Sequence, residues 1–575
     1  MPARRAVIVF IVLFTILGGS ILLLEVAARR TGVAMAAETV LVFDVPARLE
    51  EGGPPAGTGL FELLRRDRPT VWMLAQAIRR GAADDRVKAL VLHVDGIGWG
   101  WAKVAEIRDA VSAFRAAGKP VYASLAGGGE REYLLASAAG TLAAPPLAVL
   151  ELDGLSASAL FFRGTFDKVG ITPNFAHVGA YKSGVEPWTR SGFTPASKEA
   201  LQAMVDDHYR LFADSVGAAR RMPPDAVERL LDDGPFGARD ARARGLLDTL
   251  LYRADLDSLA VRRAHGTTLS LARYAERGTA AGGPRIALIV AAGAIAEGRS
   301  RGGATEGDVL GAETLIRALR EARTRASIRA VVLRIDSPGG SAQAADEIWR
   351  EVERLRERKP LIVSMSDLAA SGGYYIAVPA DSIVAEPATL TGSIGVFGGK
   401  LNVLGLYRKL GLNVETVSRG RHAEMLSPFK DFTPEESARF QVQMDEVYRT
   451  FLARVAAGRR LTTAQVDSVG GGRVWTGLAA SSRRLVDALG GIDRAMAMAR
   501  ARAGLTATEP VTVEVLPHVE RPLFQRFFTD LLGDEDDPEA DASVELPAVV
   551  RAWIAAAGFP SGQALALMPW SIEIR

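Results

Sequence analysis

A glycine-rich turn carries the residue best suited to nucleophilic chemistry. Residues 369–375 read AASGGYY, and they follow a second glycine turn, DSPGG at 336–340. A turn of small residues presents the hydroxyl of Ser371 beside backbone amides, and glycines let such amides approach a substrate carbonyl and stabilise an oxyanion. Ser371 is therefore the candidate nucleophile, and the next question is which group removes its proton.

The chain contains an internal repeat, and the repeat predicts the elements that must position this turn. VKALVLHVD at 87–95 returns 241 positions later as IRAVVLRID at 328–336. In both copies an apolar strand pattern precedes a helical pattern and a second strand, which is typical of βαβ units in a parallel sheet. We predict two α/β domains, at 38–260 and 285–500, joined by a polar, glycine-rich linker at 261–284.

Alignment of the two copies shows that each has kept a different reactive residue. Ser371 of the second copy aligns with Gly129, and Lys182 of the first copy, in GAYKSGVEP, aligns with Ala423. This divergence fits one composite site assembled from both halves. The competing interpretation is that Lys182 is an ordinary surface lysine. Its turn-rich surroundings favour an exposed segment, and loops often carry function.

A lysine acts as a general base only when its amine is neutral. Starting from a pKa near 10.4, activity near pH 7.5 requires a fall of about three units, or roughly 4 kcal/mol, which burial against apolar walls can supply. A nearby carboxylate would raise the pKa, so Glu186, four residues after Lys182, must point elsewhere. Hydroxyl groups orient an amine without adding charge, and Ser393 in TGSIGV is one candidate.

A Ser-His-Asp triad is the main rival, and His422 is the best placed of the six histidines. A lone histidine between charged residues is more often a solvated surface group. Zinc hydrolysis has little support because no His-Glu-x-x-His spacing occurs, and the absence of cysteine excludes a thiolate nucleophile. A formal net charge of +2 and scattered basic residues give no support for nucleic-acid binding.

The N-terminus predicts a membrane anchor within residues 1–30. Arg4 and Arg5 precede an uncharged stretch from Ala6 to Leu24. Its nineteen residues would span roughly 28 Å as a helix, close to the hydrocarbon thickness of a bilayer. Cleavage as a signal peptide after the AMA at 34–36 and a buried helix are the alternatives. The short leading segment places the bulk of the chain outside the cytoplasm.

Four motifs give the chain a family resemblance. They are DSPGG at 336–340, AASGGYY at 369–375, TGSIGV at 391–396 and YKSGVEPWTR at 181–190. In these motifs, and in the tandem repeat over residues 38–500, the chain resembles signal peptide peptidase A in its long, duplicated form. The resemblance implies tandem ClpP/crotonase-like domains behind an N-terminal transmembrane helix.

The resemblance also implies a function and a set of site residues. It describes a serine endopeptidase, anchored in the bacterial inner membrane with its catalytic part on the periplasmic side, that degrades cleaved signal peptides and needs no cofactor. Its Ser–Lys dyad maps to Ser371 and Lys182, its oxyanion hole to the amides of Gly372 and Gly339, and the hydroxyl that orients the lysine to Ser393.

The resemblance further implies a homotetramer that admits extended apolar peptides. A C-terminal extension at 505–575 has no assigned role. Two other function classes remain open from the residues. One is a non-catalytic peptide-binding scaffold at the membrane, and the weaker one is a crotonase-like acyl-CoA enzyme. The serine and lysine count against the scaffold, and the anchor counts against the acyl-CoA enzyme.

Overall fold

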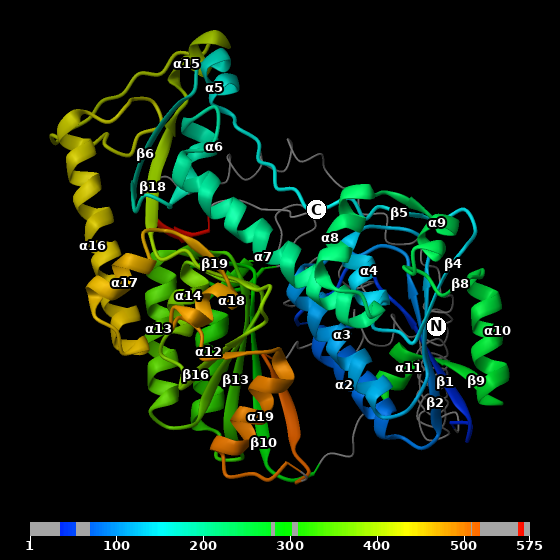
Figure 1. Cartoon of the computed structure of the whole chain (residues 1–575). Coiled ribbons are helices and arrows are strands. Elements are labelled where there is room, and N and C mark those ends of the chain that lie inside the picture. Colours follow the sequence, from blue (N-terminus) through cyan, green and yellow to red (C-terminus); the bar gives the residue numbers. More distant parts are fainter. Residues whose placement is uncertain are drawn as a thin grey trace, which may run out of the picture.

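The computed structural model is that of an α/β protein with two parallel sheets and a third, mixed sheet (Figure 1). It describes residues 35–52, 69–277, 282–301, 309–507, 509–517 and 562–568. The anchor predicted within residues 1–30 lies outside these residues. In the part of the chain that is described, no helix is both long enough and apolar enough to cross a membrane.

The first parallel sheet has the strand order β8-β4-β3-β2-β1-β9. Its strands are β1 (Thr39–Asp44), β2 (Val87–Val94), β3 (Val121–Leu125), β4 (Thr141–Ala144), β8 (Thr249–Leu250) and β9 (Thr267–Ser270). The near-continuous apolar runs of the central strands are expected where helices cover both faces of a sheet. Helices α2 (Val71–Ala83) and α3 (Trp101–Ala116) pack on one face, and α10 (Arg253–Ala264) packs on the other.

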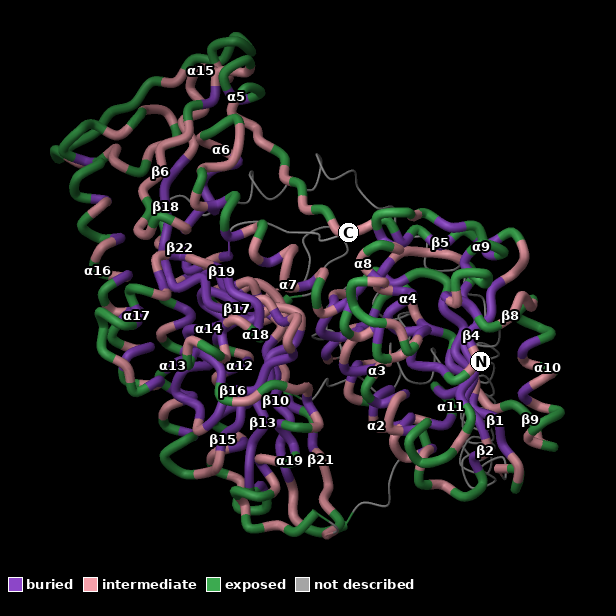
Figure 2. The backbone as a smooth tube through the Cα atoms, in the orientation of Figure 1, coloured by how far each residue is buried: buried purple, intermediate pink, exposed green. Residues whose placement is uncertain are grey.

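The second parallel sheet repeats this order as β20-β16-β15-β13-β10-β21. Its strands are β10 (Arg285–Ala292), β13 (Ile328–Ser337), β15 (Leu361–Ala370), β16 (Ser382–Ala385), β20 (Ala488–Leu489) and β21 (Thr512–Leu516), and β15 also pairs with β17 (Leu390–Gly392), which pairs with β19 (Val474–Thr476). The repeated motifs of the sequence form β2 and β13, so the predicted duplicated α/β architecture is confirmed. Figure 2 shows the strands of both sheets as largely buried.

Equivalent helices cover the second sheet. Helices α12 (Ala312–Thr324) and α13 (Ala342–Arg356) pack on one face, and α19 (Ile492–Arg502) packs on the other. Two 26-residue helices, α7 (Pro195–Arg220) and α16 (Pro434–Arg459), begin at equivalent Thr-Pro pairs, and each is capped by its threonine hydroxyl. A threonine N-cap followed by proline is a strong helix start.

The third sheet joins the two halves of the chain, with the order β12-β11-β14-β22-β18-β6. Its strands are β6 (Thr172–Val178), β11 (Ala294–Ala296), β12 (Val309–Gly311), β14 (Gly339–Ser341), β18 (Val396–Asn402) and β22 (Ala564–Leu567). Strand β6 belongs to the first half of the sequence but pairs antiparallel with β18 of the second half over its whole length. This pairing carries the chain that follows β6 into the second half.

Short elements complete the fold. They are β5 (Val149–Leu150), β7 (Phe236–Gly237), α4 (Glu130–Ala136), α5 (Arg163–Val169), η2 (Ser183–Val185), α6 (Glu186–Thr189), α8 (Pro224–Asp233), α9 (Ala238–Ala243), α11 (Leu271–Glu276), α14 (Gly372–Ala377), α15 (Leu404–Lys409), α17 (Thr463–Val469) and α18 (Gly477–Ser482). Three of these elements, α14, η2 and α6, contribute to the site described below. Helix α14 follows β15 directly, and η2 and α6 follow the turn after β6.

Two segments that the sequence left without structure contribute strands. The predicted linker at 261–284 contains β9 and α11, and β9 pairs with β1. The C-terminal extension at 505–575 contains β21, which pairs with β10, and β22. Strands β9 and β21 are short edge strands. Their local sequence does not distinguish them from loops, and they are recognised as strands only by their pairing in the structure.

Candidate active site

Ser371 lies at a sharp turn between β15 and α14. Its backbone has φ 55° and ψ −112°, a conformation that residues other than glycine rarely adopt. Its N–H donates to the carbonyl of Gly392 at 2.8 Å, which anchors the turn to β17. Residues held in strained backbone conformations concentrate at functional sites, where the surrounding structure enforces the strain. The strand–turn–helix unit therefore fixes the Ser371 hydroxyl at the end of the sheet.

The lysine loop reaches this turn from the other half of the sequence. Lys182 follows β6, and the pairing of β6 with β18 brings its loop beside residues 470–472. The N–H of Tyr181 donates to the carbonyl of Gly471 at 2.8 Å. A Cβ on Gly472 would stand 2.4 Å from the Lys182 backbone nitrogen, so only a glycine permits this close approach. Lys182 is 1% exposed in the resulting contact.

The predicted site residues Lys182, Ser371 and Ser393 lie in direct contact. The Nζ atom of Lys182 is 2.7 Å from Oγ of Ser371. It is also 3.0 Å from both the carbonyl oxygen and Oγ of Ser393. All three side chains are buried, and Ser393, like Ser371, has a positive φ, of 51°.

The surroundings of Lys182 favour its neutral form. Burial holds the pKa of the Lys182 amine well below the ordinary lysine value, because desolvation penalises the charged form. Glu186 does point elsewhere. Its carboxylate accepts hydrogen bonds from the hydroxyls of Thr194 and Ser197, at 2.6 and 2.7 Å, at the start of α7. An ammonium at this position would therefore lack the compensating charge that buried cations need.

The two predicted oxyanion residues, Gly339 and Gly372, face each other. A Cβ on Gly339 would stand 2.6 Å from the amide nitrogen of Gly372. Gly339 has a φ of 93°, within the region that favours glycine. Its N–H donates to Oγ of Ser337 at 3.2 Å, and that hydroxyl donates to the carbonyl of Gly293 at 2.7 Å. These contacts hold the DSPGG turn against the first turn of α14.

His422, the rival base, lies in another environment. Its imidazole faces the start of α16, where Nε2 is 3.4 Å from Oε1 of Glu435 and Nδ1 is 3.9 Å from Oε1 of Glu436. Lys182, and not His422, contacts the Ser371 hydroxyl. The sequence analysis favoured a non-catalytic role for this loop histidine, and its position beside two carboxylates agrees with that interpretation.

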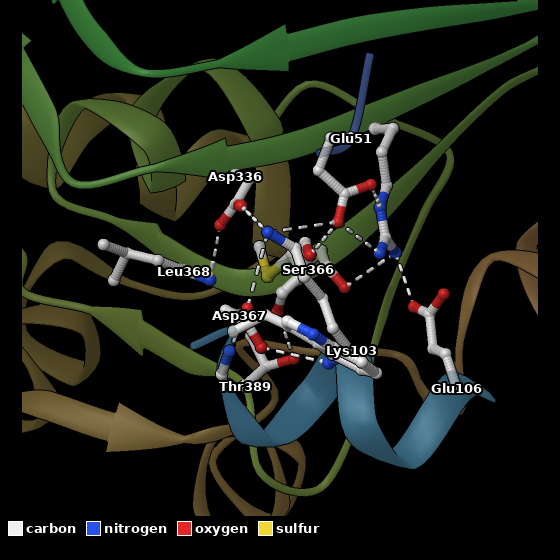
Figure 3. A network of polar contacts seen from close by, with 12 residues as sticks. Glu51, Lys103, Glu106, Asp336, Ser366, Asp367, Leu368 and Thr389 are labelled. Atoms are coloured by element: carbon white, nitrogen blue, oxygen red, sulfur yellow. Dashed lines mark hydrogen bonds and ion pairs between the residues drawn. The ribbon is translucent and has the colours of Figure 1, made fainter. Parts of the chain in front are cut away.

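A buried network of charges behind the site joins the two halves (Figure 3). Arg334 of β13 is fully buried, and its guanidinium donates to the carboxylate of Glu51 at 2.7 and 2.9 Å and to that of Glu106, on α3, at 2.6 Å. A bidentate arginine–carboxylate pair is among the strongest protein hydrogen-bonding arrangements. Removal of one partner from such a buried pair costs about 3–5 kcal/mol, because the other charge is left uncompensated.

Lys103 links the same network to the oxyanion turn. Its ammonium donates to Asp336, the first residue of DSPGG, at 2.7 Å, and it lies 3.5 Å from Asp367. Burial alone would lower the pKa of Lys103, but these carboxylates and Glu51 raise it above the ordinary lysine value. Asp336 also accepts from the N–H of Leu368, at 3.2 Å, on the strand that leads to Ser371. The network thus ties the start of the oxyanion turn to β15.

Sequence reasoning missed several residues of this site. Gly472 and Gly395 pack against Lys182, and the run of three glycines at 470–472 was a visible signal for a close backbone approach. Lys103 and Arg334 gave no such signal, because a single charged residue in a helix or a strand is usually solvated. Their partners are distant in sequence and are brought together only by the tertiary structure.

The chain is similar in sequence to known proteins. The pattern of peptidase family S49 matches residues 113–264 and 353–506. Serine protease SPPA from the chloroplast of Arabidopsis thaliana is 36% identical over 76% of this chain and 67% of its own length. Protease 4 of Salmonella typhi is 33% identical over 75% of this chain and 72% of its own length.

Two solved structures are also similar to parts of the chain. A ClpP1 mutant from Listeria monocytogenes has a TM-score of 0.24 at 12% identity and covers 36% of this chain and 94% of its own. A mutant of a membrane-bound stomatin-specific protease has a TM-score of 0.27 at 13% identity and covers 41% of this chain and 99% of its own. The family match extends over both halves of the sequence. The chain belongs to peptidase family S49 and is a serine peptidase.

Proposed function

We propose that this peptidase works through a Ser–Lys dyad formed by Ser371 and Lys182. The observation that carries the proposal is the 2.7 Å separation of Lys182 Nζ and Ser371 Oγ, in a buried setting that lowers the pKa of the amine. A neutral amine has two N–H donors and one lone pair. With the two donors directed at the carbonyl and the hydroxyl of Ser393, the lone pair is left to face Ser371.

The reaction then follows from this geometry. Lys182 accepts the proton of the Ser371 hydroxyl as Oγ attacks a peptide carbonyl, and the tetrahedral intermediate forms. The protonated lysine gives its proton to the departing amine, which leaves an acyl-enzyme. A water molecule, deprotonated by Lys182, hydrolyses the ester and restores Ser371. We assign stabilisation of the oxyanion to the amides of Gly372 and Gly339, since preorganised donors often contribute most to the rate of such reactions. The Gly339 N–H would exchange its bond to Oγ of Ser337 for one to the oxyanion.

We further propose the substrates and setting that the family resemblance implies. A relative from Enterococcus faecium is named a putative signal peptide peptidase SppA, and it is 35% identical over 30% of this chain. Cleaved signal peptides are apolar and extended, which suits a site at the edge of a sheet. The proposed enzyme has ClpP/crotonase-like units, is anchored in the bacterial inner membrane with its catalytic part on the periplasmic side, and assembles as a homotetramer.

The dyad is tested by turnover of an apolar fluorogenic peptide. Ser371→Ala should lower kcat by at least about 10³-fold, because no other group replaces the nucleophile. His422→Ala should keep the wild-type rate and serves as the matched test of the triad. Turnover by Ser371→Ala would remove the serine from the mechanism. Loss of turnover in His422→Ala, with folding intact, would favour the triad, and a wild-type chain without activity would favour the peptide-binding scaffold.

A further inference from the structure

The C-terminal strand β22 fills a slot beside the catalytic residues. It pairs antiparallel with β14 on one side and with β18 on the other. Without β22, the third sheet would separate into β12-β11-β14 and β18-β6, with two unpaired edges facing each other across the width of one strand. Such a slot is suited to bind an extended peptide by strand addition on both sides.

Backbone contacts hold this segment along the slot. Gly562 donates its N–H to the carbonyl of Gly399 in β18 at 2.9 Å, and Met568 donates its N–H to the carbonyl of Pro338 at 2.6 Å. Between these points Gly340 of β14 stands opposite Ala566. The segment is thereby tied to the DSPGG turn, whose glycines are assigned above to the oxyanion hole.

One carbonyl of the segment lies beside the two proposed oxyanion residues. The oxygen of Ala566 is 2.0 Å from the position that a Cβ on Gly339 would take, and 3.0 Å from the corresponding position on Gly372. The Ala566 carbonyl therefore lies against both proposed oxyanion residues. In this register the strand that completes the sheet brings a backbone carbonyl next to the proposed oxyanion residues.

The side chains of the segment enter apolar sites next to the dyad. Leu565 is buried in a cluster with Val185, three residues after Lys182, and Phe397. Met568 is buried with Ala370, the residue before Ser371. Residues 564–568 read ALALM, with no charged or polar side chain. This is the same chemistry that the proposed substrates present.

We propose that residues 562–568 are a built-in substrate mimic that occupies the peptide-binding slot between β14 and β18 and blocks it until a substrate displaces them. The expected inhibition of peptide turnover rests on the proposed peptidase function, whereas the occupation of the slot by residues 562–568 does not. A tethered segment has an effective concentration of order millimolar, so an affinity of about 100 µM would leave the slot free roughly one tenth of the time.

The test weakens the segment within the full-length chain. Leu565→Asp places a charge in an apolar site and should release the segment, which lowers KM for an apolar fluorogenic peptide about tenfold with kcat unchanged. Val417→Asp, at a fully exposed position, makes the same type of substitution outside the slot and should leave both constants unchanged. A KM that stays the same or rises in Leu565→Asp, together with a lower melting temperature, would show that β22 is only structural and would overturn the proposal.

A binding measurement separates this inference from the catalytic one. A fluorescent peptide with the sequence of residues 562–568 should bind Ser371→Ala/Leu565→Asp about tenfold more tightly than it binds Ser371→Ala alone, by anisotropy. This result does not depend on turnover, so it would stand even if the dyad were inactive. Equal binding by the two variants would overturn the substrate mimic while leaving the dyad untouched.

Discussion

The two halves of the chain build the same glycine turn but bring different groups to it. In the first half the carboxylate of Glu132 accepts hydrogen bonds from the backbone N–H groups of Ile97, at 2.7 Å, and Gly129, at 3.1 Å. In the second half the corresponding turns contain Gly339 and Ser371, and the Ala566 carbonyl oxygen lies against the glycines there. The amides of the first turn bind a carboxylate, whereas a backbone carbonyl oxygen lies beside the glycines of the second.

This difference shows what the shared turn is suited for. Backbone amides that converge at a helix start attract negative charge, whether it is a fixed carboxylate or a developing oxyanion. In the first half Gly129 has φ −97°, a relaxed conformation, and its N–H donates to the Glu132 carboxylate. In the second half Ser371 is strained at φ 55°. The first copy has stabilised its turn, and the second copy has kept strain and a nucleophile.

Side-chain contacts also correct the alignment of the two copies. The alignment that places Ser371 on Gly129 pairs Tyr133 with Tyr375 as well. In the structure, however, the hydroxyl of Tyr133 donates to the carbonyl of Leu246 at 2.8 Å, and its equivalent is Tyr374, which donates to the carbonyl of Leu485 at 2.9 Å. Three residues separate Gly129 from Tyr133, whereas two separate Ser371 from Tyr374.

The comparison makes Lys182 the residue of the first half whose loss should reduce activity most. Lys182→Met keeps the volume and removes the base, and kcat for an apolar peptide should fall about 10²–10⁴-fold. Lys198→Met, at an exposed position of α7, provides the matched control and should keep the wild-type rate. If Lys182→Met retained more than about a tenth of the activity, another base would have to be sought.

The second prediction concerns pH, since burial lowers the pKa of Lys182. The rate should rise with pH through that lowered value. The unfolded lysine binds a proton below about pH 10.4 while the native amine stays neutral, so the free energy of unfolding falls as pH falls toward the native pKa, by up to about 1.4 kcal/mol per unit. The Lys182→Met variant has no such titrating amine. The difference in the free energy of unfolding between this variant and the wild type should therefore shift in favour of the variant from pH 9 to pH 6, as measured by urea titration. Parallel stability curves would contradict a neutral native lysine.

The third prediction addresses the resident carboxylate of the first half. Glu132→Gln keeps an acceptor but loses the charge, and the free energy of unfolding should fall by about 1–2 kcal/mol with kcat unchanged. Glu347→Gln on the exposed face of α13 is the control and should change stability by less than about 0.5 kcal/mol. Equal effects of the two substitutions in thermal unfolding would mean that the amides of this turn gain nothing from an anion.

The smallest effect is expected when the lost serine is restored. In Gly129→Ser the new Cβ would stand 3.5 Å from the carbonyl of Glu151, an ordinary contact, and φ −97° suits serine. Stability should change by less than about 0.5 kcal/mol. No second active site should appear, because the position that corresponds to Lys182 holds Ala423. Combined with Ser371→Ala, the variant should stay inactive, and turnover by this double variant would contradict a composite site.

Much of this organisation was predictable from local pattern. Repeated apolar runs marked β2 and β13, and the Thr-Pro pairs marked the starts of α7 and α16. The reciprocal loss of serine in one copy and lysine in the other predicted that the site would draw on both halves. Such features depend on periodicity and on local helix-start chemistry, which short stretches of sequence carry.

The rest depends on contacts between distant segments. The pairing of β6 with β18 decides where Lys182 lies, yet TPNFAHV at 172–178 has no pattern that specifies this partner. Lys103 and Arg334 read as solvated charges, because burial with Asp336 and Glu51 is set by how the halves pack. Strand β22 lies in a C-terminal extension whose sequence suggested no role.

The most direct test of the dyad is covalent labelling with a serine-directed phosphonate probe, followed by peptide mapping. Wild-type protein should carry the label on Ser371, and labelling should increase with pH as the Lys182 amine loses its proton. In Lys182→Met the label should be nearly absent at every pH between 6 and 9. A label on another residue, or equal labelling of Ser371 with and without the lysine, would contradict the account.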